Sequence, residues 1–465
     1  MKDQLQYLFQ MKKFPQKRPI AVDLFAGVGG MTLGFEQAGF DVLASVEIDP
    51  IHCAAHEFNF PFWSVICQDV RQLTGEAIRQ SSSIQNQDID VVCGGPPCQG
   101  FSLIGKRVLE DERNALVFHF LRLVLELKPK YFVMENVVGM AIGKSQQLLN
   151  ELIEQFQKNS YQVQLPYQVL NAVNFGIPQN RKRLFLLGCR HDQILPNYPT
   201  PITRPAKSKV TLLNNHQPDS PTVKDALIDL PMIENYPELL TQDTVKAEFG
   251  KPSCYSNQLR QRGATRARVS RASESAPYGR KKDDYSYPRT YDSSLLTASL
   301  RTQHTEKSMT RFAETLPGKT EPVSRFFKLD PDGICNTLRA GTASNRGAYT
   351  SPRPIHPHLP RCITVREAAR LHSYPDWFRF HVTKWHGFRQ IGNSVPPLLA
   401  RAVAKEILKV LGIIPLQLKD HSNLGEEYLL KLDMSKAAQL YQVDPHVIAP
   451  KTRKNKQGTN QNGKS

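Results

Sequence analysis

Cys98 lies on a short loop whose residues are as compatible with a reactive cysteine as with a buried structural one. The loop spans residues 93–102 (CGGPPCQGFS) and follows an apolar run at residues 89–93 that predicts a buried parallel strand. Pro96 and Pro97 fix two φ angles, while the neighbouring glycines permit close approach of a backbone or a flat ligand. A thiol on a rigid turn after a strand is typical of a nucleophile, but buried structural cysteines are also common. The loop alone leaves both interpretations open.

Four acidic residues fall at the same end of successive predicted strands. The strands are residues 20–24, 42–49, 63–67 and 130–134, and the acids are Asp23, Glu47, Asp69 and Glu135. Such acids are often only helix caps or solvated loop residues. However, the carboxyl ends of parallel strands meet at one edge of a sheet, so these side chains are expected to converge on one cleft.

The first strand leads into a glycine-rich turn, FAGVGGMTLGF at residues 25–35, and then into a helix ending near Gly39. A strand, a glycine turn, a helix and a second strand ending in an acid are typical of a nucleotide-type cofactor site. The turn is not GxGxxG, because Thr32 occupies the position of the third glycine. This argues against a dinucleotide dehydrogenase.

The fold class predicted for the first half is α/β, a doubly wound Rossmann-like sheet. Apolar residues at helical spacing predict helices at 112–127 and 145–158, and an apolar run predicts a strand at 88–93. After Tyr161 the pattern changes to strands, which are expected at 162–172, 175–183 and 184–189. A late amphipathic helix is expected at 396–412.

Composition limits the function classes. The chain has 465 residues, enough for two or three domains, and its net charge of +17 with a pI near 9.5 favours a polyanionic partner. Its eight cysteines form no CxxC pair, so neither a metal site nor a disulfide framework is expected. No signal peptide and no apolar run of about 18 residues is apparent, and we expect a protein of the reducing cytoplasm with no membrane span.

Eight motifs occur together and in order: DLFAGVGG, VEID, QDV, GGPPCQGFS, ENV, QNRKR, REAARLHSYPD and IGNSVPP. This series, over about residues 18–190 and 361–410, closely resembles the DNA (cytosine-5) methyltransferase family. The resemblance implies transfer of a methyl group from S-adenosyl-L-methionine to carbon 5 of a cytosine that is flipped out of duplex DNA. It also implies a covalent cysteine intermediate and a role as a solitary methylase or in a restriction-modification system.

The resemblance assigns catalytic roles to four residues. Cys98 corresponds to the nucleophile that adds to carbon 6 of the base. Glu135 corresponds to the acid that donates to ring nitrogen 3, which requires a raised pKa or a shared proton. Arg183 and Arg181 correspond to residues that hold the base carbonyl and order the site. The alternative is that these two arginines form a basic patch that only binds DNA phosphates.

The cofactor assignments follow the same resemblance. Glu47 corresponds to the ribose-binding acid and Asp69 to the acceptor of the adenine amino group. The remaining cofactor residues lie on the glycine turn, beside the two acids, on the cysteine loop and on a late segment that completes the pocket: Phe25, Ala26, Gly27, Gly29, Gly30, Ile48, Val70, Pro96, Asn393 and Ser394.

The implied domain organisation places a catalytic domain at 18–190, a smaller, mostly β or irregular target-recognition domain at 191–360, a return segment at 361–412, and an appendage with a disordered tail at 413–465. Within the recognition domain, residues 251–290 carry ten Lys and Arg against three acids, a pattern suited to phosphate contact or to a solvated loop. Arg366, Glu367 and Arg370 of the return segment are expected to be structural. Expected DNA contacts are Gln99, Ser102, Gln179, Thr337, Asn345 and Arg346.

Two alternatives share this fold. An RNA methyltransferase of the same family would carry a Cys-Phe-Thr signature, which this sequence lacks. A non-catalytic DNA-binding relative would be expected to have lost Cys98, Glu135 or the glycine turn, and all three are present. The expected protein is thus a monomeric, prokaryotic, cytoplasmic enzyme that binds double-stranded DNA. Its recognition sequence, the base that deprotonates the thiol and the role of residues 413–465 cannot be read from the sequence.

Overall fold

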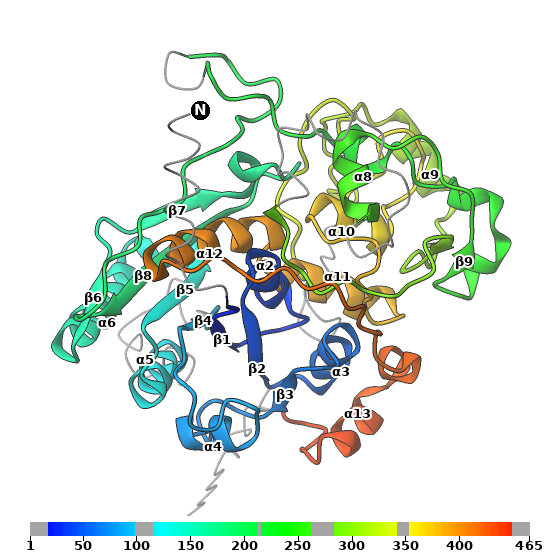
Figure 1. Cartoon of the computed structure of the whole chain (residues 1–465). Coiled ribbons are helices and arrows are strands. Elements are labelled where there is room, and N and C mark those ends of the chain that lie inside the picture. The colour runs from blue at the N-terminus through cyan, green and yellow to red at the C-terminus, as the bar shows by residue number, and fades with distance from the viewer. Residues whose placement is uncertain (1–16, 98–114, 212–214, 262–282, 342–352, 449–465) are drawn as a thin grey trace, which may run out of the picture.

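The computed structural model describes residues 17–97, 115–211, 215–261, 283–341 and 353–448. Within these residues an eight-stranded mixed sheet forms the centre of the molecule, in the order β3-β2-β1-β4-β5-β8-β6 with β7 paired to β8 (Figure 1). The strands are β1 Ile20–Leu24, β2 Asp41–Glu47, β3 Ser64–Cys67, β4 Val91–Gly94, β5 Tyr131–Val137, β6 Tyr161–Val163, β7 Gln168–Asn171 and β8 Lys182–Arg190.

Strands β1 to β5 are parallel to one another, whereas β6, β7 and β8 join the sheet in antiparallel pairs. The chain moves outward from β1 through β2 to β3, then returns to place β4 on the other side of β1. Strand order therefore reverses between β1 and β4, and ligands of open α/β sheets bind at such a reversal. The predicted doubly wound sheet is confirmed.

Successive strand residues supply two separate cores because side chains alternate across a sheet. In β1, Ala21 packs with one core and Val22 with the other, and in β5 Tyr131 and Phe132 divide in the same way. The first core also includes α2 Gly30–Ala38, α3 Pro50–Asn59 and α12 Pro397–Leu411. The second includes α4 Gly75–Gln80, α5 Ala115–Leu127 and α6 Lys144–Lys158.

The predicted late helix, α12, returns to pack against α2 (Figure 1). The two backbones meet at Gly34, where an added Cβ would lie 2.6 Å from the Pro397 carbonyl oxygen and 2.8 Å from the Arg401 amide nitrogen. Only a residue without a side chain allows this approach. The family resemblance implied that this late segment returns to the first domain, and the structure shows that it does so on α2.

The segment between β8 and the return is mostly irregular. Its described elements are α7 Val223–Leu227, α8 Cys254–Gln261, α9 Glu306–Glu314 and the two-stranded pair β9 Val245–Lys246 and β10 Leu295–Leu296. The return then forms α10 Val365–Leu371 and α11 Lys384–Asn393, and the chain continues to α13 Met434–Leu440. Short 3-10 turns occur at Val138–Ala141, Ala172–Phe175, Ile233–Asn235, Pro237–Leu240 and Glu427–Lys431.

The prediction that α10 carries structural charges is confirmed. Arg370 donates to Asp229 at 2.5 Å and to Asp376 at 2.7 Å, and Arg361 pairs with Glu367 at 2.8 Å. Glu367 also closes the capping box of α10 with Thr364. These charges are buried and paired, so they fix the recognition half against the return segment.

The predicted strand at residues 175–183 is wrong. The chain forms a 3-10 turn over Ala172–Phe175 and a loop up to Arg181, and β8 begins only at Lys182. Pro178 has no amide hydrogen to give to a sheet ladder. The neighbouring backbone groups bond instead to Cys335: the Cys335 amide donates to the Pro178 carbonyl, and the Asn180 amide donates to the Cys335 carbonyl.

Among the described residues, no helix is long and apolar enough to cross a membrane.

Candidate active site

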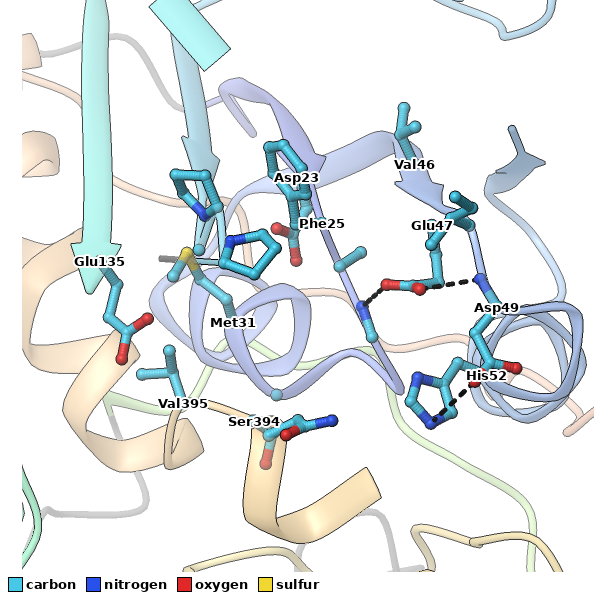
Figure 2. Close-up of a pocket in the computed structure, with 18 of the residues that line it drawn as sticks. Asp23, Phe25, Met31, Val46, Glu47, Asp49, His52, Glu135, Ser394 and Val395 are labelled. Atoms are coloured by element: carbon cyan, nitrogen blue, oxygen red, sulfur yellow. Dashed lines mark hydrogen bonds and ion pairs between the residues drawn. The ribbon is translucent and has the colours of Figure 1, made fainter. Parts of the chain in front are cut away.

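The main cavity opens at the carboxyl edge of the parallel strands and has a volume of about 490 Å³. Asp23, Glu47, Asp69 and Glu135 all line it, contributed by β1, β2, the residues after β3, and β5. Figure 2 shows Asp23, Glu47 and Glu135 around this space. The sequence-based expectation that these acids converge is confirmed.

The glycine turn forms the floor between β1 and α2. Phe25 has φ 62°, Gly27 φ 55° and Gly29 φ 98°, so the backbone turns through the left-handed region three times in five residues. At Gly29 an added Cβ would also lie 2.6 Å from the Phe60 ring. The turn thus needs glycine for both conformation and space.

Glu47 is held by two backbone donors. The Gly27 amide donates to Oε2 and the Asp49 amide to Oε1, both at 2.9 Å, as the dashed lines in Figure 2 show. These bonds fix the carboxylate plane, and each oxygen keeps a lone pair for another donor. Glu47 is therefore oriented to accept hydrogen bonds from a ligand in the cavity, as a ribose hydroxyl pair would require.

Asp69 and Asp23 differ in charge. Burial alone would raise the pKa of Asp69, but hydrogen bonds from Arg71 at 2.8 and 2.6 Å outweigh burial and keep the pKa below its usual value. Burial raises the pKa of Asp23 to about 7, although its Oδ2 accepts a 2.7 Å bond from the Thr32 hydroxyl. Asp69 is thus ionised at neutral pH, while Asp23 titrates near it.

Glu135 pairs with an arginine of the neighbouring strand. Arg183 Nε lies 2.8 Å from Glu135 Oε1, and both side chains are largely buried. Burial raises the pKa of Glu135, and the positive charges of Arg183 and Arg181 oppose this shift without reversing it. The raised pKa is the property that a proton donor at this position requires.

The cysteine loop approaches Glu135 directly. The Asn136 side chain donates to the Pro96 carbonyl at 2.9 Å, and an added Cβ on Gly95 would lie 3.0 Å from Glu135 Oε2. Pro97 lines the cavity and is the last described residue before the gap that contains Cys98. Cys98, Gln99 and Ser102 lie outside the described residues, as do Asn345 and Arg346.

Arg181 does not reach the cavity. Its guanidinium is buried and donates to the carbonyls of Leu338 at 2.7 Å, Gly392 at 2.8 Å and Ser394 at 2.9 Å. It therefore joins the recognition half and the return segment to β8. These contacts agree with the implied role of ordering the site, whereas the buried guanidinium does not line the cavity where the base carbonyl is expected.

Gln179 and Thr337 also connect the loop before β8 to distant parts of the chain. Gln179 is fully buried, with its amide bonded to Leu371 and Leu338 backbone groups, so in this structure it is a structural residue and not a surface for DNA. Thr337 donates to the Asn180 carbonyl at 2.7 Å. The pair Thr337 and Leu338 thus connects the recognition half to the loop before β8.

Of the predicted cofactor residues, one does not line the cavity: Gly29 packs against Phe60 and His56 instead. The others do so: Phe25, Ala26, Gly27, Gly30, Glu47, Ile48, Asp69, Val70, Pro96, Asn393 and Ser394. Sequence reasoning missed further lining residues, notably Asp49, His52, Arg389 and Ile448. Asp49 lies in the VEID motif and could have been included, whereas no local pattern points to the other three.

S-adenosyl-L-methionine fits this cavity by charge and size. Its sulfonium and amino groups are cationic, and the carboxylates of Glu47 and Asp69 line the walls. The volume is in the range of small-molecule sites. A doubly wound sheet with a glycine turn after β1, an acid at the end of β2 and an antiparallel β5–β8 pair is the arrangement of Rossmann-like methyltransferases.

Comparison with known proteins specifies the family. The chain matches the C-5 cytosine-specific DNA methylase family over residues 20–409. It is 55% identical over 438 residues to the type II methyltransferase M.XorII of Xanthomonas oryzae pv. oryzae, covering 94% of this chain and 95% of that relative. It is 31% identical to M.AgeI of Thalassovita gelatinovora, covering 83% and 98%.

Among solved structures, one described as a DNA modification methyltransferase encoded within an E. coli prophage superposes with a TM-score of 0.63. It is 33% identical and the match covers 84% of this chain and 99% of that one. The chain belongs to the C-5 cytosine-specific DNA methylase family. It is a DNA cytosine-5 methyltransferase that uses S-adenosyl-L-methionine, as the sequence motifs predicted.

Proposed function

We propose that the enzyme methylates carbon 5 of a cytosine flipped out of duplex DNA, through a covalent adduct with Cys98. The observation that carries this proposal is the Glu135–Arg183 pair, which lies on the same cavity as the cofactor residues and directly beside the cysteine loop. These contacts support a site in which a proton donor, a cation and the methyl donor adjoin the loop that carries Cys98.

The adduct solves a chemical problem, because carbon 5 of cytosine is a weak nucleophile. The Cys98 thiolate adds to carbon 6, and Glu135 donates its proton to ring nitrogen 3 as electrons move there. The resulting enamine carbon would attack the methyl group that S-adenosyl-L-methionine supplies when it is held by the cavity residues, and the neutral thioether S-adenosyl-L-homocysteine would be the leaving group. A base then removes the carbon 5 proton, the carbon–sulfur bond breaks, and nitrogen 3 returns its proton to Glu135.

Arg183 has two tasks in this scheme. Its Nε holds the Glu135 carboxyl and Nη1 donates to the Lys182 carbonyl at 2.8 Å, while the residue lines the cavity, where its positive charge would stabilise charge developing on the base carbonyl. Arg181 acts indirectly, because its carbonyl contacts fix the segment that carries Asn393 and Ser394 at the cavity wall.

DNA is the substrate of the family, and we propose that this enzyme acts on duplex DNA as a monomer in the prokaryotic cytoplasm, as part of a type II modification system. The identity with M.XorII supports the type II assignment. The net charge of +17 supports binding to a polyanion. Gln99, Ser102, Asn345 and Arg346 remain candidate DNA contacts.

The proposal is tested by trapping. A duplex with 5-fluorocytosine at the target should form an adduct with the enzyme that survives denaturing electrophoresis, because fluorine does not leave as a proton does. Cys98→Ala should abolish the adduct and methyl transfer but retain DNA binding, whereas Cys254→Ala, an exposed cysteine distant in sequence, should behave as wild type. Methyl transfer by Cys98→Ala at the wild-type rate would refute the covalent route, and trapping on tRNA but on no duplex would indicate an RNA enzyme.

A further inference from the structure

One wall residue of the cavity comes from the chain beyond the return segment. Ile448 lines it together with Ile48, Asp69 and the glycine turn, although it lies well beyond the end of α12 at Leu411. The family match ends at residue 409. The segment that carries Ile448 is therefore an addition to the matched catalytic unit.

This C-terminal segment, residues 413–448, is firmly attached to the fold. The Gly425 amide donates to the Phe58 carbonyl at 2.8 Å, at the end of α3, and an added Cβ on Gly425 would lie 2.8 Å from Phe58 Cα. Leu429 and Leu430 are buried in the same core as α2 and α12. The segment thus packs as part of the catalytic core.

The next contacts direct the segment along α3. The Tyr441 hydroxyl donates to Glu57 Oε2 at 2.6 Å, joining the end of α13 to α3, and Figure 1 shows these two helices as neighbours. The chain then turns: the Val447 amide donates to the Asp444 carbonyl at 3.0 Å, and the His446 amide donates to the Asp444 side chain at 2.8 Å. This turn leads to Ile448 at the cavity.

The position of α3 indicates which end of the cavity Ile448 covers. Helix α3 begins directly after Glu47, Ile48 and Asp49, and it packs against β3, which precedes Asp69. The C-terminal segment contacts α3 at Glu57 and Phe58, so the wall residue that it supplies, Ile448, is expected on the α3 side of the cavity, with Glu47 and Asp69. Glu135 and the cysteine loop come from β5 and β4, beyond β1 in the sheet.

We propose that Ile448 is a cofactor-binding residue, and that its apolar side chain covers the adenosine part of S-adenosyl-L-methionine. This proposal rests on the assignment of the cavity as the cofactor site. Covering a flat apolar ring removes it from water, which strengthens binding without involving the reacting atoms. The segment at 413–448 then has a function: it closes the outer wall of the cofactor site.

The test compares variants of the full-length enzyme in binding of S-adenosyl-L-methionine, measured by titration calorimetry without DNA. Ile448→Ala should raise Kd about 5- to 10-fold, up to about 1.4 kcal/mol, while Ile448→Met should stay within about twofold. Val447→Ala is the matched control, because Val447 lies in the same turn, is half-buried and does not line the cavity. In steady state, KM for the cofactor should rise in Ile448→Ala and kcat should remain unchanged.

A Kd for Ile448→Ala equal to that of Val447→Ala would overturn the proposal. Glu47→Gln separates this failure from a wrong site assignment. If Glu47→Gln weakens cofactor binding and Ile448→Ala does not, the cavity is the cofactor site but Ile448 has no part in it. If neither variant changes Kd, the cavity itself is wrongly assigned.

Discussion

Arg183 and Glu135 lie on neighbouring antiparallel strands, and their side chains share one face of the sheet. Arg183 is opposite Val137 in the ladder, two residues along β5 from Glu135, and the two charged groups meet at 2.8 Å. Diagonal pairs of this kind are within reach of long side chains. Strand pairing therefore fixes the orientation of the proposed proton donor before any substrate binds.

Glu135→Gln removes the proton donor and keeps the shape of the side chain. We expect kcat for methyl transfer to fall by about 10²- to 10⁴-fold, the usual contribution of a general acid. Transfer of a labelled methyl group to duplex DNA measures this effect. The Kd for S-adenosyl-L-methionine should stay within about twofold, and an unchanged kcat would exclude Glu135 as the donor.

Arg183→Ala should change both the rate and its pH dependence. Loss of the cation is expected to lower kcat by about 10²- to 10³-fold, as for other donors that stabilise developing charge. Because Arg183 lowers the pKa of Glu135, its removal raises that pKa further. The alkaline limb of the kcat profile, where Glu135 loses its proton, should shift to higher pH. A shift to lower pH would contradict the assignment.

Arg181→Ala should destabilise the fold more than it alters chemistry. It would leave the buried carbonyls of Leu338 and Gly392 without their donor, whereas the Ser394 carbonyl keeps its contact with His372 Nε2 at 3.1 Å. Since each unsatisfied group costs about 1–3 kcal/mol, we expect the free energy of unfolding in urea to fall by at least about 2 kcal/mol. Arg190→Ala is the control on the adjoining strand β8, because Arg190 pairs with Asp192 at the surface and should change stability by at most about 1 kcal/mol.

Asp23 should make stability fall as pH rises. Its pKa is about 7 in the fold and near 3.8 in the unfolded chain, so the native state binds the extra proton between these values. The stabilisation is complete below pH 3.8 and is lost as pH rises through 7. Asp23→Asn should therefore be more stable than wild type at pH 8, by several kcal/mol, and the difference should shrink toward pH 4. Urea unfolding of both proteins from pH 4 to pH 8 measures this difference in unfolding free energy. A difference that does not change with pH would contradict the raised pKa of Asp23.

Gly34→Ala tests the contact between α2 and α12. The new methyl group would lie 2.6 Å from the Pro397 carbonyl oxygen, so the helices must separate, at a cost of about 1–3 kcal/mol or more. Gly139→Ala is the matched control, because nothing lies within 4 Å of its added Cβ. Thermal unfolding of both variants measures this cost. Equal melting temperatures would show that α12 is not closely packed against α2 at Gly34.

The central fold could be predicted because its signals are local. Each of β1 to β5 is a short apolar run, and the glycine turn, the terminal acids and the amphipathic α12 are visible in a window of about ten residues. The convergence of Asp23, Glu47, Asp69 and Glu135 then follows from the rule that parallel strands end together. The roles of individual cofactor and catalytic residues stay predictions that the experiments above address.

The remaining features depend on contacts between distant parts of the chain. The loop before β8 is set by hydrogen bonds with Cys335, and the three carbonyls around Arg181 come from residues more than 150 positions away. The fully buried pair of Glu36 and Arg289 joins residues 253 apart. Ile448 reaches the cavity only because α13 packs on α3. None of these has a local pattern, so a single sequence cannot reveal them.

The packing of α12 on α2 also sets the order of events during synthesis. Helix α2 ends at Ala38, whereas its partner is complete only at Leu411. At about 5–20 residues per second, the ribosome needs on the order of 20–75 s to supply that partner. Throughout this interval the face of α2 that α12 covers in the finished fold has not yet met that partner.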